Sequence, residues 1–156
     1  MATLEMIHVG EDGTRSAGTR VLGPVTAGRV PEAQRLDFLP RHFGRRMLAF
    51  ETQVYTELAD LCEGYNGGLW AFFDLSNGGC YMAPSDPSFA LVQPSNTFEG
   101  TVSGDAAGII ATLYALSRLA FQYEAEAGMR FTERFHQLRE YALAHAEAAA
   151  ILRAID

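Results

Sequence analysis

Residues 65–84 read Tyr-Asn-Gly-Gly-Leu-Trp-Ala-Phe-Phe-Asp-Leu-Ser-Asn-Gly-Gly-Cys-Tyr-Met-Ala-Pro, and this stretch decides the fold. It contains the single tryptophan of the chain, four other aromatic residues and two Asn-Gly-Gly sequences. Asn-Gly between apolar runs is the strongest short-range signal of a β-hairpin, because a type I′ turn needs positive φ at both central residues. We therefore predict a hairpin with strands at Leu69–Leu75 and Gly79–Ala83.

Apolar side chains occupy both faces of the first predicted strand. Trp70 and Phe72 alternate with Leu69, Ala71 and Phe73, and residues 65–84 contain no arginine. We expect one face to pack against helices. An uncovered apolar face marks an interaction surface, and we predict that role for the second face. Burial of both faces in the core is the alternative.

The length and composition indicate one globular domain. A chain of 156 residues that is 48% hydrophobic can bury a full core, so disorder is excluded. No apolar run approaches the ~20 residues that span a bilayer, and the N-terminus has no signal-peptide pattern, so we expect a cytoplasmic protein. Cys62 and Cys80 lack CxxC spacing and the four histidines are scattered, so we expect reduced thiols, no metal and no cofactor.

The charge argues against two classes of DNA-related protein. The net charge is −7 and all twelve basic residues are arginines, so a basic nucleic-acid footprint is missing and direct nucleic-acid binding is not expected. Duplex DNA carries one charge per ~1.7 Å of axis, whereas the nineteen acidic residues here are diluted by those arginines. The balance favours a partner-binding protein over a DNA mimic.

Apolar periodicity and turn residues outside the hairpin predict an α+β fold. Residues 1–30 have no aromatic residue and no sustained periodicity, so we expect a flexible N-terminal arm with at most one short strand at Arg20–Val25. Residues 31–156 should form one domain. A first helix is predicted from Pro31 to about Pro40, and a second from Arg41 or Gly44 to Cys62, stopped by Gly64.

The second half of the chain adds strands and two long helices. Strands at Phe89–Gln93 and Thr97–Val102 should extend the hairpin into an antiparallel meander. A central buried helix should start at Ser103 or Asp105, with small residues at 106–108 that admit a neighbouring backbone. After Gly128, a last helix is predicted from Phe131 to about Ile155. The expected fold is therefore a small antiparallel sheet of three to four short strands packed with about four helices.

Few residues could carry catalytic chemistry. Asp74 and Glu99, on two predicted neighbouring strands, could form a carboxylate pair for acid–base work, although each could equally be an outward-facing strand residue. His42 lies beside three arginines in Leu-Pro-Arg-His-Phe-Gly-Arg-Arg, which could bind an anion or an acidic partner. The chain has no nucleophile elbow, no phosphate-binding glycine loop and no HExxH sequence.

Several motifs in the same order resemble the ArdB/KlcA antirestriction family over about residues 32–156. They include Leu-Asp-Phe-Leu-Pro-Arg-His-Phe-Gly at 36–44, Leu-Ser-Asn-Gly-Gly at 75–79, Tyr-Met-Ala-Pro at 81–84, Phe-Glu-Gly at 98–100, Asp-Ala-Ala-Gly-Ile at 105–109, Phe-His-Gln-Leu at 135–138 and Ala-Ala-Ala-Ile at 148–151. Leu69, Phe73 and Cys80 depart from the family pattern, which weakens any role for those three side chains in binding a partner.

The resemblance implies a small α+β protein of plasmids and other mobile elements. Such proteins protect incoming, unmodified DNA from type I restriction enzymes, are not enzymes and do not imitate DNA. We therefore predict an antirestriction protein that contacts the type I restriction-modification complex or a host factor controlling it. The sequence leaves open a monomer or a dimer. The predicted interaction face consists of Asp74, Ser76, Asn77, Gly78, Gly79, Tyr81, Asn96, Phe98 and Glu99.

Two other functions remain as alternatives. A small hydrolase or ligand-binding enzyme would use Asp74 and Glu99 in one concave pocket, with at least one raised carboxyl pKa. A DNA-binding regulator would use the arginines within Arg41–Arg46, and its affinity would be strongest at low salt.

Overall fold

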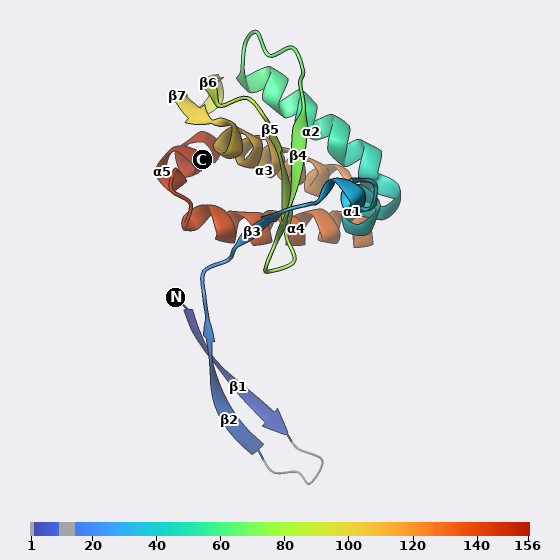
Figure 1. Cartoon of the computed structure of the whole chain (residues 1–156), viewed down its shortest axis with the longest axis vertical. Coiled ribbons are helices and arrows are strands. Elements are labelled where there is room, and N and C mark those ends of the chain that lie inside the picture. The colour runs from blue at the N-terminus through green and yellow to red at the C-terminus, as the bar shows by residue number, and fades with distance from the viewer. Residues whose placement is uncertain (1, 10–14) are drawn as a thin grey trace.

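The structure is a computed structural model that describes residues 2–9 and 15–156, with side chains from residue 23 onward. Figure 1 shows the arrangement of the elements. The helices are α1 (Arg35–Phe43), α2 (Met47–Leu61), α3 (Gly104–Gln122), α4 (Ala125–Leu143) and α5 (Ala148–Ile155), with short 3₁₀ turns η1 (Glu32–Gln34), η2 (Gly44–Arg46) and η3 (Pro94–Asn96). The strands are β1 (Ala2–Val9), β2 (Arg15–Leu22), β3 (Ala27–Arg29), β4 (Trp70–Leu75), β5 (Cys80–Pro84), β6 (Ser88–Gln93) and β7 (Phe98–Ser103). The predicted α+β class is confirmed.

The predicted aromatic hairpin forms the centre of the fold. β4 and β5 pair antiparallel, with Trp70 opposite Pro84 and Asp74 opposite Cys80. The turn differs from the predicted type I′ geometry, because Gly78 has a positive φ of 94° and Asn77 does not. The amide of Gly78 donates to the Leu75 carbonyl at 3.0 Å, and the amide of Leu75 donates to the Gly79 carbonyl at 2.9 Å. This pattern is a type I turn followed by a glycine bulge.

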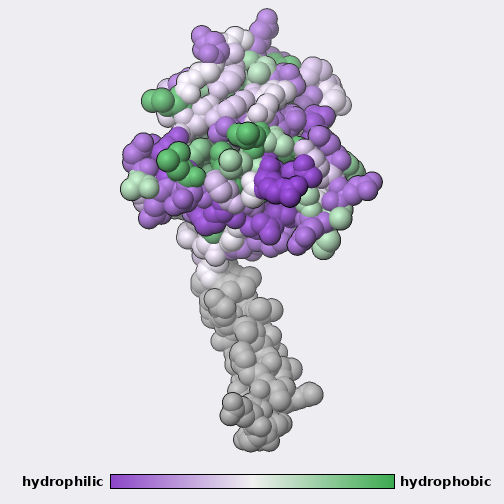
Figure 2. Space-filling view, turned by 90° about the vertical axis from the view of Figure 1, so that its right-hand side faces the viewer, coloured by the Kyte–Doolittle hydropathy of each residue, from purple (hydrophilic) through white to green (hydrophobic). Residues whose placement is uncertain are grey.

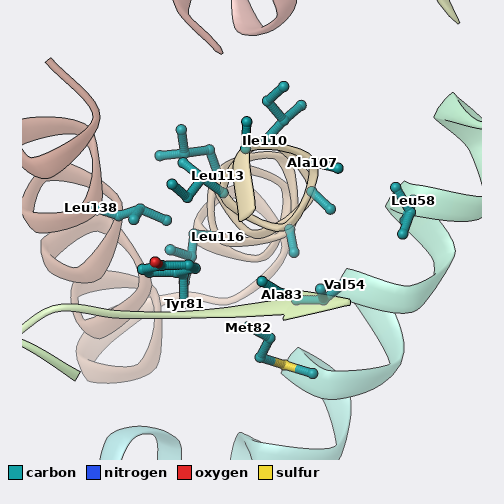
Figure 3. Packing of buried hydrophobic residues seen from close by; sticks show 14 of the residues in the cluster. Val54, Leu58, Tyr81, Met82, Ala83, Ala107, Ile110, Leu113, Leu116 and Leu138 are labelled. Atoms are coloured by element: carbon teal, nitrogen blue, oxygen red, sulfur yellow. The ribbon is translucent and has the colours of Figure 1, made fainter. Parts of the chain in front are cut away.

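Helices cover both faces of the hairpin, so the predicted open apolar face is wrong. Every residue of β5 is buried. In Figure 3, Tyr81 and Ala83 point toward α3, whereas Met82 points to the opposite side of the strand. On that opposite side, Phe38 of α1 stacks on Phe72 of β4 with ring centroids 4.6 Å apart. The strands are therefore buried between α1 and α2 on one side and α3 and α4 on the other.

The helix α3 is the predicted central helix, and its apolar residues Ile109, Ile110, Leu113, Leu116 and Leu119 are all buried. Ser103 caps its N-terminus, accepting a hydrogen bond from the amide of Ala106 at 3.0 Å. Gly108 lies so close to β5 that a Cβ there would be 2.3 Å from the Met82 carbonyl oxygen. The small residues thus bring helix and strand backbones together, as predicted.

Two predicted helix boundaries are wrong. Pro40 lies inside α1 and does not end it. Proline removes the hydrogen bond that its amide would donate to the Leu36 carbonyl, but Leu36 is 92% exposed, so water can reach this part of the helix. Gly128 does not separate the last two long helices, because it lies in the first turns of α4. The chain turns instead at Tyr123 and Glu124, followed by Ala125 with a φ of 55°.

The predicted last helix is also interrupted. It divides into α4 and α5 at residues 144–147, although apolar residues continue at helical spacing through this segment. The amide of Glu147 donates to His145 Nδ1 at 2.9 Å. The Glu147 carboxylate accepts hydrogen bonds from the amide and hydroxyl of Ser103. These contacts hold the chain in a turn against the start of α3.

The strands form separate sheets and not the single meander that was predicted. In the described residues the sheets are β1-β2, β3-β4-β5 and β6-β7, all antiparallel. The first two strands, and β3, lie where the sequence predicted an arm with one short strand at most. The predicted flexibility of residues 1–30 stays a prediction, and within that segment residues 1 and 10–14 lie outside the described residues.

Candidate interaction site

The turn at the tip of the aromatic hairpin, Ser76–Gly79, is held against α4 and the start of β3. Asn77 Nδ2 donates to the Gln137 carbonyl at 2.9 Å, and Gln137 Nε2 donates to the Asn77 carbonyl at 3.0 Å. A Cβ at Gly79 would be 2.7 Å from the Gln137 Cβ. Ser76 Oγ accepts a hydrogen bond from the amide of Thr26 at 2.9 Å. In this turn only Ser76 and Gly78 are exposed.

Asp74 is bound by two basic side chains of α1. Arg41 donates to both carboxylate oxygens, at 3.2 and 2.9 Å, and His42 Nε2 lies 2.7 Å from Asp74 Oδ1. His42 is 4% exposed, and its Nδ1 has no hydrogen-bond partner in the described part of the chain. Cys80, opposite Asp74 on β5, is a buried free thiol whose pKa is raised by burial. The cluster fixes α1 on the hairpin.

The pKa values of His42 and Asp74 are both lowered, and these directions favour the ion pair between Asp74 and Arg41. Burial lowers the pKa of His42, while the hydrogen bond to Asp74 acts in the opposite direction and Arg134 and Arg41 disfavour a second positive charge. Burial alone would raise the pKa of Asp74, but the hydrogen bonds from Arg41 and His42 outweigh it and hold the pKa below its usual value. The folded protein therefore favours a neutral imidazole beside a carboxylate.

We expect this cluster to make the protein less stable in mild acid. The unfolded chain binds a proton at His42 near the ordinary pKa of 6.5, whereas the folded state resists it. The contribution of the neutral His42 imidazole to the free energy of unfolding is therefore fully present above pH 6.5. It is lost as the pH falls through the lowered pKa of His42 in the folded state. Urea unfolding between pH 8 and pH 5 should show this decline.

Two variants test the assignment of the pH dependence. His42→Gln keeps a donor for Asp74 but does not titrate, so it should flatten the decline. His136→Gln is a matched control, since His136 is exposed, and it should leave the profile unchanged. An equally steep decline in His42→Gln would contradict the role given to this imidazole.

Tyr81 belongs to a buried network that joins β5, α3 and the α4–α5 turn. Its side chain is 1% exposed and stacks on Phe73 at 4.7 Å. Its hydroxyl donates to Asp105 Oδ1 at 2.7 Å, and His145 Nε2 lies 2.8 Å from Asp105 Oδ2. Burial and the Asp105 carboxylate raise the pKa of Tyr81, so the phenol keeps its proton. In this conformation Tyr81 is not available to a partner.

The second predicted segment, Asn96–Glu99, contacts the end of α5. Asn96 Nδ2 donates to the Ala154 carbonyl at 2.8 Å, and its Oδ1 accepts from the amide of Phe98 at 3.0 Å. Phe98 is 4% exposed, with the Arg153 guanidinium 5.9 Å from its ring centroid. Glu99 is exposed. Asn96 and Phe98 thus hold the chain together, whereas Thr97 and Glu99 are exposed to solvent.

Asp74 and Glu99 lie on strands of different sheets, β4 and β7, and not on neighbouring strands as the carboxylate-pair hypothesis required. The hollow of about 580 Å³ beside Asp74 is lined by Gln34, Asp37, Pro40 and Arg41 but not by Glu99. The pKa of Asp74 is lowered and not raised. These observations remove the support for the hydrolase alternative.

Several partners of the predicted residues have no signal in the sequence. Gln137, Asp105 and His145 lie about 24 to 60 residues away in the chain from the side chains they bind. Each lies in a helix or turn whose sequence pattern only shows apolar spacing. The neighbouring arginines distinguish His42 in the sequence, but its contact with Asp74 depends on how α1 packs on the sheet.

Comparisons with known proteins give a consistent result. A family profile described as "Antirestriction protein" matches residues 63–156. Antirestriction protein KlcA of Escherichia coli is 50% identical over 136 residues, covering 85% of this chain and 96% of that protein. Another E. coli protein of the same name is 46% identical over 142 residues, covering 88% of this chain and 97% of the relative.

A solved structure of this group is also similar. It has a TM-score of 0.78 and 48% sequence identity, and the match covers 88% of this chain and 99% of that one. The KlcA and ArdB proteins are described there as having a novel fold and antirestriction activity against type I DNA restriction systems in vivo but not in vitro. In the described part of the present chain, none of the helices is long and apolar enough to cross a membrane.

Proposed function

The chain belongs to the antirestriction protein family, and on this basis we propose that it protects incoming plasmid or phage DNA from type I restriction enzymes of the host cell. The observation that carries the proposal is the 50% identity to KlcA across 96% of that protein. The same proposal places the protein in the cytoplasm, where incoming DNA meets the restriction enzyme, and gives it no catalytic step of its own.

Protein–protein contact is the proposed mode of action. The charge supports contact over DNA mimicry, because nineteen acidic residues are offset by twelve arginines. Several carboxylates are also bound within the fold: Glu57 accepts from Arg118 Nε at 2.5 Å, and Asp74 is held by Arg41. Carboxylates neutralised in this way cannot reproduce the regular charge of a DNA backbone.

A plating assay tests the function. Cells with an active type I system and the expressed protein should plate unmodified phage better than the same cells with an empty vector. Phage already carrying the host modification is the control, and it should plate equally in both. Unchanged plating of unmodified phage would refute the proposal.

The partner is proposed to be the restriction-modification complex or a host factor that controls it. The related KlcA and ArdB proteins have antirestriction activity in vivo but not in vitro. This difference favours a partner that is present in the cell but absent from the purified restriction enzyme. Adding the purified protein to a purified type I enzyme distinguishes the two. We expect unchanged DNA cleavage if a host factor is needed, and reduced cleavage if the enzyme itself is the target.

The exposed members of the predicted interaction face, Ser76, Gly78 and Glu99, remain candidates for partner contact. Deleting the hairpin turn would not test them, because Asn77 and Gly79 pack on α4. Single changes at the exposed positions, such as Ser76→Arg and Glu99→Arg, leave those contacts in place. A loss of protection in either variant, at unchanged protein abundance, would support this face.

A further inference from the structure

An arginine-lined hollow lies between η2 and the first turns of α4. Its lining includes Arg45, Arg46 and Arg130, with the buried rings of Phe43 and Phe131 behind them and one acid, Glu126. The volume is about 300 Å³. The two rings stack with centroids 5.6 Å apart, so α1 and α4 are fixed to each other at this place. We call this the arginine hollow.

Within the described part of the chain, the three arginines lack acidic partners. Among the residues that the structure describes, ion pairs hold Arg35, Arg41, Arg118 and Arg134, but no carboxylate lies within 4.0 Å of the guanidinium nitrogens of Arg45, Arg46 or Arg130. All three side chains belong to exposed residues. Three free positive charges at one place are notable in a chain of net charge −7, and they favour an anionic occupant.

Two of these guanidinium groups are already held in position. Arg130 donates through one terminal nitrogen to the His42 carbonyl at 3.1 Å. The Arg46 guanidinium lies 4.4 Å from the ring centroid of Tyr123. Fixing side chains before binding reduces the entropy lost in the complex. Guanidinium groups bind carboxylates in a planar, two-bonded geometry.

The arginine hollow continues into an apolar surface along the α3–α4 connection. A second hollow of about 660 Å³ shares Arg130 with it, and a third of about 240 Å³ shares Ala120 with the second. Met129 and Phe121, on these hollows, are 71% and 89% exposed. Figure 2, which faces the right-hand side of Figure 1, shows hydrophobic residues directly beside strongly hydrophilic ones. Arginine, methionine and aromatic residues are enriched in protein interfaces.

We propose that this continuous surface binds an acidic segment of a partner protein. Carboxylates of the segment pair with Arg45, Arg46 and Arg130, and its apolar side chains cover Met129 and Phe121. The inference rests on the proposed function, since it names the chemistry of the partner that the antirestriction activity would need. A charged hollow that continues into an apolar surface accommodates a polypeptide better than a free inorganic anion.

A protein segment fits better than a nucleic acid. Duplex binding depends on neutralising many phosphates, whereas only three free arginines line the surface, together with Glu126 and Glu133. The apolar residues would contribute nothing to a phosphate backbone.

The plating assay tests the surface in cells with a charge reversal inside the arginine hollow and another outside it. The double variant Arg45→Glu/Arg46→Glu should lose protection of unmodified phage. Arg29→Glu, at an exposed arginine of β3 without an acidic partner within the described chain, should protect like the parent. Phe121→Ser removes an exposed ring without disturbing the core, and it should weaken protection. Thermal unfolding and protein abundance establish that each variant is folded.

The outcomes distinguish a failure of the proposed function from a failure of the proposed partner site. If the parent protein does not protect, the proposed function fails. If the parent protects and the double variant protects equally well, the function stands and the arginine hollow is not the partner site.

A binding measurement identifies the class of ligand. The probes are a short labelled peptide alternating glutamate with leucine, its glutamine counterpart, and a labelled DNA duplex, each followed by fluorescence anisotropy. We expect the glutamate peptide to bind, the glutamine peptide and the duplex to bind far more weakly, and the double variant to lose the glutamate peptide. Tighter binding of the duplex, or peptide binding that the double variant retains, would overturn the proposal.

Discussion

Gly108→Ala is expected to destabilise the protein by about 3 kcal/mol, because overpacking against a fixed backbone carries a cost of this size. The new Cβ would be 2.3 Å from the Met82 carbonyl oxygen and 2.5 Å from the Ala83 Cα. Both atoms belong to the backbone of β5, so the helix and the strand would have to separate. Helix propensity alone favours alanine over glycine by about 1 kcal/mol, so the two effects have opposite signs.

Urea unfolding measures which effect prevails. Gly28→Ala is the matched control, since Gly28 has open space around its Cα and does not have a positive φ. We expect its free energy of unfolding to change by less than about 1 kcal/mol. A Gly108→Ala variant as stable as the parent would show that α3 and β5 are not in the close contact described.

Asp74→Ala is expected to cost about 2 kcal/mol, because it leaves a buried imidazole without its hydrogen-bond partner. His42 is 4% exposed and its Nδ1 is already unpaired in the described chain, so the ring would keep only the contact of its Nε2 with Arg41 Nη1 at 3.4 Å. The loss of the Arg41 pair contributes little to this value, because both side chains of that pair are partly exposed.

Glu99→Ala is the matched control for Asp74→Ala. Glu99 is an exposed strand residue, so its removal should change the free energy of unfolding by less than about 0.5 kcal/mol. Equal effects of the two changes would contradict the structural role of Asp74. If Asp74→Ala also lowers protection against restriction, protein abundance must be compared, since a loss of stability alone reduces the amount of folded protein.

Local sequence patterns predicted the elements well where one rule acted alone. Asn-Gly-Gly between apolar runs predicted the β4–β5 hairpin, and the apolar steps from Met47 to Leu61 predicted α2. Small residues at 106–108 predicted a close backbone contact on α3. Predictions failed where tertiary contacts override a local rule. Pro40 does not end α1, since the carbonyl it leaves unbonded is near solvent.

The predicted interaction face also shows that local sequence patterns do not reveal tertiary contacts. The sequence identifies Asn77, Tyr81 and Asn96 as polar residues beside turns and aromatic strands, which is typical of recognition loops. In the fold their polar groups bind Gln137, Asp105 and the end of α5. Sequence spacing could not reveal these partners, because the contacts join residues that are distant in the chain.

The sequence by itself determined the class of fold, the aromatic hairpin and the family, because each of them follows from local patterns and motifs. The tertiary structure alone decided that both faces of the hairpin are covered and that Asp74 is occupied by Arg41 and His42. It also left Arg45, Arg46 and Arg130 together without acidic partners in the described chain. The physical reason is that burial and charge pairing depend on which elements pack together, and local sequence patterns do not specify this packing.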